Sequence, residues 1–259
     1  MVLKEIQFTG LAAALLLASG SAQATFSIVA VDPVTGEIGS AGATCIGQED
    51  GALAISDIVL GRGAIHTQSF YSPQNQANAR VRMELGDSPQ QIIDWLDNND
   101  VNGNSSQRQY VVVDLNGGMP RSAGFSGPAC FTEFTEATGP GYAIAGNILI
   151  SEDVVTDMEA AFVGTVGPLG DRLMAAMQAA KRVGADSRCT SSGISSASAF
   201  VRVARPCDTD SSYGNLPLDL NVWVSGPVFE PIDALQTAYD NEPPLASCEN
   251  GLLFADGFE

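Results

Sequence analysis

The feature that most constrains the fold is the arrangement of strand and helix patterns in blocks. Along the chain, strand patterns precede a helix pair, strand patterns return, and a second helix pair and further strands follow. A doubly wound parallel sheet would alternate strands and helices one by one, so this order argues against it. Two antiparallel sheets stacked face to face, each covered by a helix pair, would bury every apolar face. We therefore predict an α+β fold, a four-layer αββα sandwich.

Apolar runs separated by turn residues mark the strands. The first two, at 26–31 and 38–43, are separated by a turn that contains Asp32, Pro33 and Gly36, a pattern typical of a hairpin. Further strands are expected at 52–60, 63–68, 110–114, 119–125, 142–150, 197–204 and 220–224.

Capping residues mark the helices. Ser72 followed by Pro73 predicts a helix start, and Gly86 predicts its end. Ser88 and Gln91 have the spacing of a capping box at the start of the next helix. The second pair is expected at 152–162, with Ser151 as its cap, and at 169–183, between Pro168 and Gly184, and a short helix is expected at 231–239.

The first 24 residues have the pattern of a cleavable secretory signal. A short head with one lysine precedes an apolar run at 11–18, and Ala22 and Ala24 form a small-x-small cleavage site. The run is far shorter than the roughly 20 apolar residues that span a bilayer. We expect an exported protein, periplasmic or secreted, that begins at Thr25. Its folded domain is expected at 25–240, followed by a linker and short tail at 241–259.

Charge limits the partners. The chain has 12 basic and 30 acidic residues and a net charge of −18. Such a surface repels phosphate backbones, which argues against nucleic acid as a partner. No later apolar segment reaches the length that spans a membrane, so we expect no membrane span. The sequence allows a homo-oligomer and does not identify the substrate, which we expect to be a small molecule or peptide-like.

The five cysteines predict disulfides, because exported proteins pass into an oxidising compartment. We expect one or two disulfides with a thiol left over, and the pairing cannot be read from the sequence. A pair between Cys189 and Cys207 is disfavoured, because an extended stretch of about 30 Å separates them. The cysteines are Cys45, Cys130, Cys189, Cys207 and Cys248.

A new amino terminus at Thr25 has a specific chemical meaning. A threonine hydroxyl is a poor nucleophile until a base removes its proton. The free α-amine of an N-terminal threonine is such a base, since its pKa is about 7.7–8.0. Thr25 can therefore supply both nucleophile and base, as in one known variant of the catalytic triad. The alternative is an inert terminus, because many exported proteins begin with Thr or Ser.

Four stretches of the sequence resemble one family. They are 25–39, 63–68, 138–147 and 184–188, and the first and third are the most specific. They resemble the family called domain of unknown function 1028, over nearly the whole expected domain. That family is grouped with N-terminal nucleophile (Ntn) hydrolases, so the resemblance implies the same αββα sandwich.

The resemblance also implies roles for individual residues. Thr25 would be the nucleophile and, through its amine, the general base. Asn147 and Gln68 would form an oxyanion hole or orient the amine. Arg188 and Asp186 would form a charged pair near the mouth of the site. These roles predict a hydrolase that cleaves an amide or related acyl bond through an acyl-Thr25 intermediate. The alternative is a non-catalytic exported binding or structural protein on the same fold.

The chain departs from the family in its extra cysteines and in His66, which stands where many members have a small residue. We interpret His66 as a structural or surface histidine rather than a catalytic one.

Other features predict no cofactor and no metal. The loop from Asn98 to Gln109 resembles a calcium loop but lacks its acidic first and last ligands, so we predict a plain turn. Zinc and nucleotide motifs are not found in the sequence.

Overall fold

The structure is a computed structural model that describes residues 25–248. The expected secretory signal at 1–24 and the end of the expected tail, 249–259, lie outside the described residues.

The first sheet has six strands, and every neighbouring pair in it is antiparallel. β1 and β2 form the expected hairpin, and β8 lies on the other side of β1. In spatial order the strands are β10 (Leu218–Trp223), β9 (Ser198–Ala204), β2 (Ile38–Thr44), β1 (Thr25–Val31), β8 (Tyr142–Asn147) and β7 (Thr135–Gly139).

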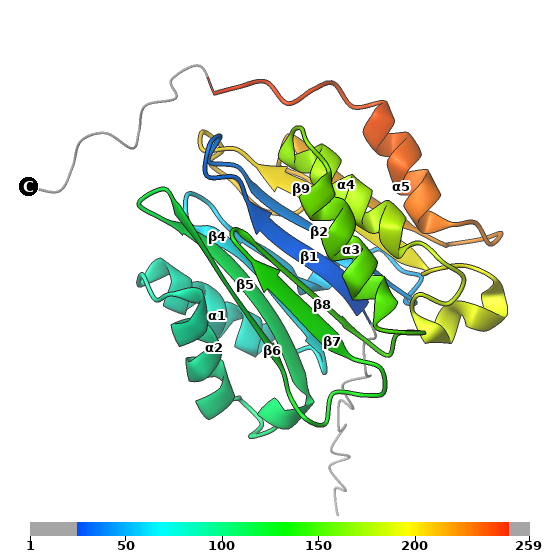
Figure 1. The fold of residues 1–259 in the computed structure, drawn as a ribbon, viewed down its shortest axis with the longest axis horizontal. Coiled ribbons are helices and arrows are strands. Elements are labelled where there is room, and N and C mark those ends of the chain that lie inside the picture. Colours follow the sequence, from blue (N-terminus) through cyan, green and yellow to red (C-terminus); the bar gives the residue numbers. More distant parts are fainter. Residues whose placement is uncertain (1–24, 249–259) are drawn as a thin grey trace, which may run out of the picture.

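The second sheet has four strands, which are also antiparallel, and it stacks on β1, β2 and β8 of the first. Figure 1 shows the two sheets side by side, with β4 and β5 next to β1 and β8. The strands are β3 (Ser56–Val59), β4 (Gly63–Ser69), β5 (Arg108–Asn116) and β6 (Met119–Ser126).

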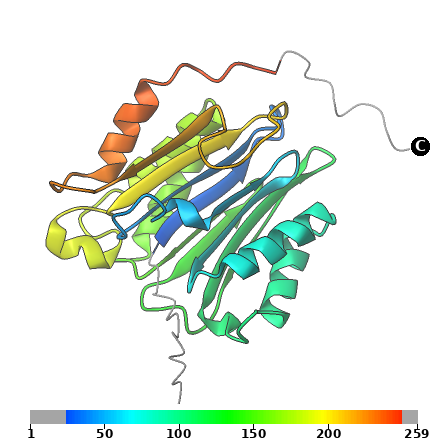
Figure 2. The ribbon, with the colours of Figure 1, turned by 180° about the vertical axis from the view of Figure 1, so that it is seen from behind.

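Helices cover the outer face of each sheet (Figures 1 and 2). α1 and α2 pack on the four-stranded sheet, and α3, α4 and α5 pack on the six-stranded sheet. The expected α+β fold with two antiparallel sheets is therefore confirmed. The helices are α1 (Pro73–Glu84), α2 (Pro89–Asn98), α3 (Asp153–Gly164), α4 (Leu169–Ala180) and α5 (Pro231–Asp240).

Alternation along β1 explains why this strand can lie between a helix layer and a second sheet. Phe26 and Ile28 pack against the helices, whereas Val29 and Val31 pack against the other sheet. Successive side chains of a strand point to opposite faces. Ser27 therefore points towards the second sheet, as its bond to Gln68 of β4 requires.

Most expected helix ends are found in the structure. The Ser72 hydroxyl accepts a hydrogen bond from the Asn75 amide, and Ser88 forms its capping box with Gln91. Gly86, just after α1, has a φ of 93°, a conformation that glycine adopts at little cost. The expected Ser151 cap is wrong. Its hydroxyl lies 3.2 Å from the Asp153 carboxylate, to which it donates instead of accepting from the helix.

Two strand predictions also differ from the structure. β7 was not predicted, because it is a half-exposed edge strand with few apolar residues to reveal a period. The expected strand at 52–60 begins with a short 3-10 turn, Leu53–Ile55, and only its second half is β3. A short apolar run does not distinguish a buried strand from a buried helical turn by periodicity alone.

The cysteines form two disulfides, Cys45–Cys189 and Cys207–Cys248, and Cys130 keeps a buried thiol. This number agrees with the expected one or two disulfides, and the disfavoured pair is not formed. Between residues 25 and 248, no helix combines the length and the hydrophobicity that a membrane span needs. The disulfides are compatible with an exported protein.

Candidate functional site

Thr25 is the first residue of β1 and is 1% exposed. It pairs with Asn147, the last residue of β8. On its other side, Thr44 ends β2, one residue after the partner of Phe26. Side chains two residues apart share a face, so Thr25 faces the second sheet, as Ser27 does. Thr25, Thr44 and Asn147 thus lie side by side at one end of the space between the sheets.

Asn147 is fully buried, and only one end of its amide is paired within residues 25–248. Its Nδ2 donates to Gln109 Oε1 at 3.0 Å, whereas its Oδ1 has no hydrogen-bond partner. A buried polar atom without a partner is uncommon and calls for an explanation. Asn147 therefore offers an acceptor beside Thr25. This arrangement suits the orientation of an amine N–H better than the donation that an oxyanion hole requires.

Gln68 reaches the same place through Gln109, which the sequence analysis missed. Gln68 Nε2 donates to Gln109 Oε1 at 2.7 Å. Gln109 Nε2 donates in turn to the carbonyl oxygen of Gly146 at 2.9 Å and to Ser126 Oγ at 2.8 Å. Gln109 shares a face with Val111 in β5, so a glutamine in register with inward-facing valines was the signal available in the sequence.

The residue after Gln68 and the residue after Asn147 both have an unusual backbone conformation. Ser69, just after Gln68, has a φ of 70°, and Ile148, just after Asn147, has a φ of 53°. A β-branched residue in this region is a genuine outlier, and such strain costs about 1–3 kcal/mol. Ser69 and Ile148 lie at the same end of the sandwich. The surrounding structure therefore maintains a backbone geometry there that is locally unfavourable.

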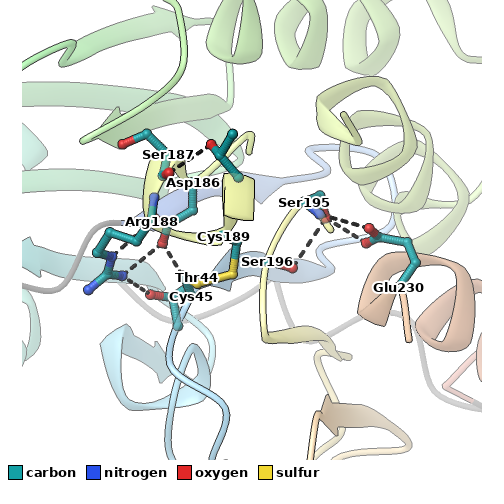
Figure 3. The surroundings of a disulfide bond; sticks show 10 residues. Thr44, Cys45, Asp186, Ser187, Arg188, Cys189, Ser195, Ser196 and Glu230 are labelled. Atoms are coloured by element: carbon teal, nitrogen blue, oxygen red, sulfur yellow. Dashed lines mark hydrogen bonds and ion pairs between the residues drawn. A yellow bond between two sulfur atoms is a disulfide. The ribbon is translucent and has the colours of Figure 1, made fainter. Parts of the chain in front are cut away.

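The expected pair of Asp186 and Arg188 is formed. Arg188 donates Nε to Asp186 Oδ1 at 3.1 Å and Nη2 to Asp186 Oδ2 at 2.8 Å, a bidentate geometry. Arg188 Nη2 also donates to Thr44 Oγ1 at 3.1 Å, so the pair lies one strand away from Thr25. Figure 3 shows this contact and the adjacent disulfide between Cys45 and Cys189. The roles assigned to both residues stay predictions.

His66 is not a surface residue: it is fully buried between the sheets. Its Nδ1 lies 2.9 Å from Ser27 Oγ, and its Nε2 lies 2.6 Å from Ser40 Oγ. Burial, with a smaller contribution from the Arg202 charge, lowers the pKa of His66 from 6.5 to about 3. The ring is therefore neutral at physiological pH.

The buried His66 predicts a loss of stability in mild acid. The pKa of His66 is lower in the folded than in the unfolded state. The stability that depends on the neutral ring is therefore complete above pH 6.5 and falls as the pH decreases towards 3. We expect about 3 kcal/mol less stability at pH 4 than at pH 7 from this residue. Urea unfolding at both pH values, for wild type and His66→Gln, measures the difference. An equal loss in both proteins would contradict the assignment.

The calcium-like loop is a turn in which Asp100 is already engaged. Its carboxylate accepts from Arg108 Nε at 2.7 Å and from the backbone amides of Asn102 and Asn104, each at 2.9 Å. Over residues 25–248, no group of three or more His, Cys, Asp or Glu side chains is placed to hold a metal ion.

A cavity of about 1040 Å³ lies at the opposite end of β1 from Thr25. The turn from Asp32 to Glu37 and the disulfide Cys207–Cys248 contribute to its wall, together with the segment 243–248. No residue of the candidate site lines it. The site is therefore defined by strand register and hydrogen bonds, and not by this cavity.

Comparisons with known proteins agree with this architecture. The structure is similar to the crystal structure of a Silicibacter pomeroyi protein assigned to the DUF1028 family, with a TM-score of 0.66 and 25% sequence identity. The similarity covers 84% of this chain and 88% of that one. No curated protein matches the chain. The model of the family of unknown function DUF1028 matches residues 25–228. The resemblance in the sequence is thus confirmed, and this protein belongs to the DUF1028 family.

Proposed function

We propose that this protein is an exported hydrolase of the Ntn type, which cleaves an amide or related acyl bond through an acyl-Thr25 intermediate. The observation that carries the proposal is the position of Thr25, which begins β1 and stands between Asn147 and Thr44. Its side chain faces the space between the sheets, where buried amides converge. The family match also begins at residue 25.

The proposed reaction needs only groups of this residue for the first proton transfer. The α-amine of mature Thr25 takes the proton from Oγ, and Oγ attacks the acyl carbon. The bond to the leaving group breaks, and the leaving group takes the proton. Water then hydrolyses the acyl ester and restores the hydroxyl. In the precursor the same nitrogen is an amide without a basic lone pair, so removal of residues 1–24 would switch the enzyme on.

The neighbours of Thr25 can assist this chemistry. The Asn147 Oδ1 atom, which lacks a partner in the described part of the chain, can accept an N–H of the amine and orient its lone pair towards Oγ. Arg188, held by Asp186, places a positive charge one strand away, where it can attract an anionic or strongly polar part of a substrate. The two helix-covered antiparallel sheets support the assignment to the Ntn type, since that fold has the same order of layers.

The test follows cleavage and acylation together. Intact mass of the exported protein should show a chain that begins at Thr25. That protein should then gain the full mass of β-propiolactone, whose ring opens without a leaving group. Peptide mapping should place the adduct on Thr25, and release by hydroxylamine should identify an ester on Oγ rather than an amide.

The matched control keeps the signal attached through Ala24→Leu, which removes the small residue before the cleavage site. This protein should not acylate at Thr25. A mature chain that begins elsewhere, or equal acylation of the uncleaved form, would refute Thr25 as nucleophile. If no form acylates, the binding-protein alternative is favoured.

A further inference from the structure

We infer that a chain of hydrogen bonds, in which donation runs one way from Arg202 through His66 to Gln109, fixes the orientation of the Asn147 amide, which also donates to Gln109. His66 is then a positioning residue for Thr25, and this part of the inference rests on the proposed function. Every residue of the chain is at most 2% exposed, so water does not compete for its bonds. The members are Arg202, Ser56, Ser40, His66, Ser27, Gln68, Gln109 and Asn147.

One end of the chain is fixed by backbone carbonyls. Gln109 Nε2 lies 2.9 Å from the carbonyl oxygen of Gly146 and 3.3 Å from that of Thr135. A carbonyl oxygen can only accept, so this end of the amide must be the nitrogen. Gln109 Oε1 must therefore accept, at 2.7 Å from Gln68 Nε2 and at 3.0 Å from Asn147 Nδ2.

The direction then passes from Gln68 to the histidine. Because Gln68 uses its nitrogen towards Gln109, its Oε1 must accept from Ser27 Oγ at 2.6 Å. That bond uses the only proton of the Ser27 hydroxyl. Ser27 Oγ must therefore accept from His66 at 2.9 Å, which places the proton of the neutral ring on Nδ1.

The other end of the chain is compatible with the same tautomer. Arg202 forms a bidentate ion pair with Asp219 and can only donate, and its Nη1 lies 3.4 Å from Ser56 Oγ. Ser56 Oγ can then donate to Ser40 Oγ at 2.8 Å, and Ser40 Oγ to His66 Nε2 at 2.6 Å. His66 Nε2 accepts in this direction, which agrees with a proton on Nδ1.

The consequence for the site follows from the last link. With the proton on His66 Nδ1, Gln109 Oε1 attracts Asn147 Nδ2 and turns Asn147 Oδ1 away from it. If the proton moved to His66 Nε2, Ser27 would donate to His66 and the Gln68 amide would have to turn over, which would place Gln68 Oε1 against Gln109 Oε1. Relief of that repulsion by rotation of the Gln109 amide would turn a nitrogen towards Asn147 Nδ2, and the acceptor that Asn147 offers beside Thr25 would then no longer be fixed.

Nuclear magnetic resonance can test the tautomer directly, because the protein has one histidine. In the folded protein labelled with ¹⁵N-histidine, we expect a neutral ring with its proton on Nδ1 and no titration between pH 8 and pH 5. Arg202 is the charged group of the chain that faces the ring, and it opposes protonation. A proton on Nε2, a mixture of tautomers or a pKa near 6.5 would overturn the chain.

Two pairs of variants test the effect on Thr25, with β-propiolactone acylation as the readout. Ser27→Ala removes the link between His66 and Gln68, whereas Val111→Ala truncates the strand partner of His66 in the same core without touching a hydrogen bond. We expect at least a tenfold slower acylation in Ser27→Ala and less than a twofold change in Val111→Ala. Equal rates in both would overturn the positioning role.

The second pair of variants distinguishes the role of His66 Nδ1 from that of His66 Nε2. His66→Asn places an amide where Nδ1 was and can still donate to Ser27, whereas His66→Gln places its amide near Ser40. We expect His66→Asn to retain more of the acylation rate than His66→Gln, and the reverse order would overturn the inferred direction. If wild type is not acylated, the proposed function fails, while the ¹⁵N spectrum still decides whether the chain exists.

Discussion

Replacement of Thr25 by alanine is expected to abolish acylation of the mature protein and to leave the fold intact. The substitution removes a small buried hydroxyl and its neighbouring methyl group at the end of a strand whose backbone pairing with Asn147 does not depend on them. Assistance by a general base contributes about 10²–10⁴ in rate, and loss of the nucleophile itself removes the whole covalent route. The measurement is intact mass after incubation with β-propiolactone, together with thermal unfolding.

Thr25→Ser is the matched control, because it keeps both the hydroxyl and the α-amine. We expect it to retain part of the acylation rate, with a loss that reflects the missing methyl group. Full acylation of Thr25→Ala at the same peptide would show that another group reacts. A Thr25→Ala protein that fails to unfold cooperatively would show that the residue is structural.

Removal of the disulfide between Cys45 and Cys189 is expected to cause the larger of the two disulfide losses in stability. It joins residues 144 apart, and the chain-entropy relation gives about 5 kcal/mol for such a loop, within a typical range of about 2–5 kcal/mol. The Cys45 amide also donates to Asp186 Oδ2 at 2.6 Å, so the loop that carries the pair with Arg188 should loosen. Urea unfolding of Cys45→Ala/Cys189→Ala measures the loss.

The disulfide between Cys207 and Cys248 provides the comparison. It joins residues 41 apart, for which the same relation gives about 4 kcal/mol, and it lies at the end of the molecule away from Thr25. Cys207→Ala/Cys248→Ala should therefore lose less stability and keep the acylation rate. A greater loss in this variant than in Cys45→Ala/Cys189→Ala would contradict the ordering.

Local patterns were sufficient to predict the elements. Apolar runs bounded by turn residues placed β1 and β5, and caps at Ser72 and Ser88 placed the first helix pair, because these signals depend on neighbours along the chain. The predictions failed where the local signal is weak or ambiguous. β7 has little apolar content, and Ser151 has the residue type of a cap but hydrogen-bonds to Asp153.

The sequence by itself determined the secondary-structure blocks, the α+β class and the family, and it proposed Thr25 through its place after Ala24. Only the tertiary structure decided which polar residues meet. Gln109 lies 84 residues from Thr25 along the chain, yet it binds Asn147, the strand partner of Thr25. His66 of the four-stranded sheet likewise contacts Ser27 and Ser40 of the six-stranded sheet. Such contacts depend on strand register and sheet stacking, which bring distant residues together without leaving a local pattern in the sequence.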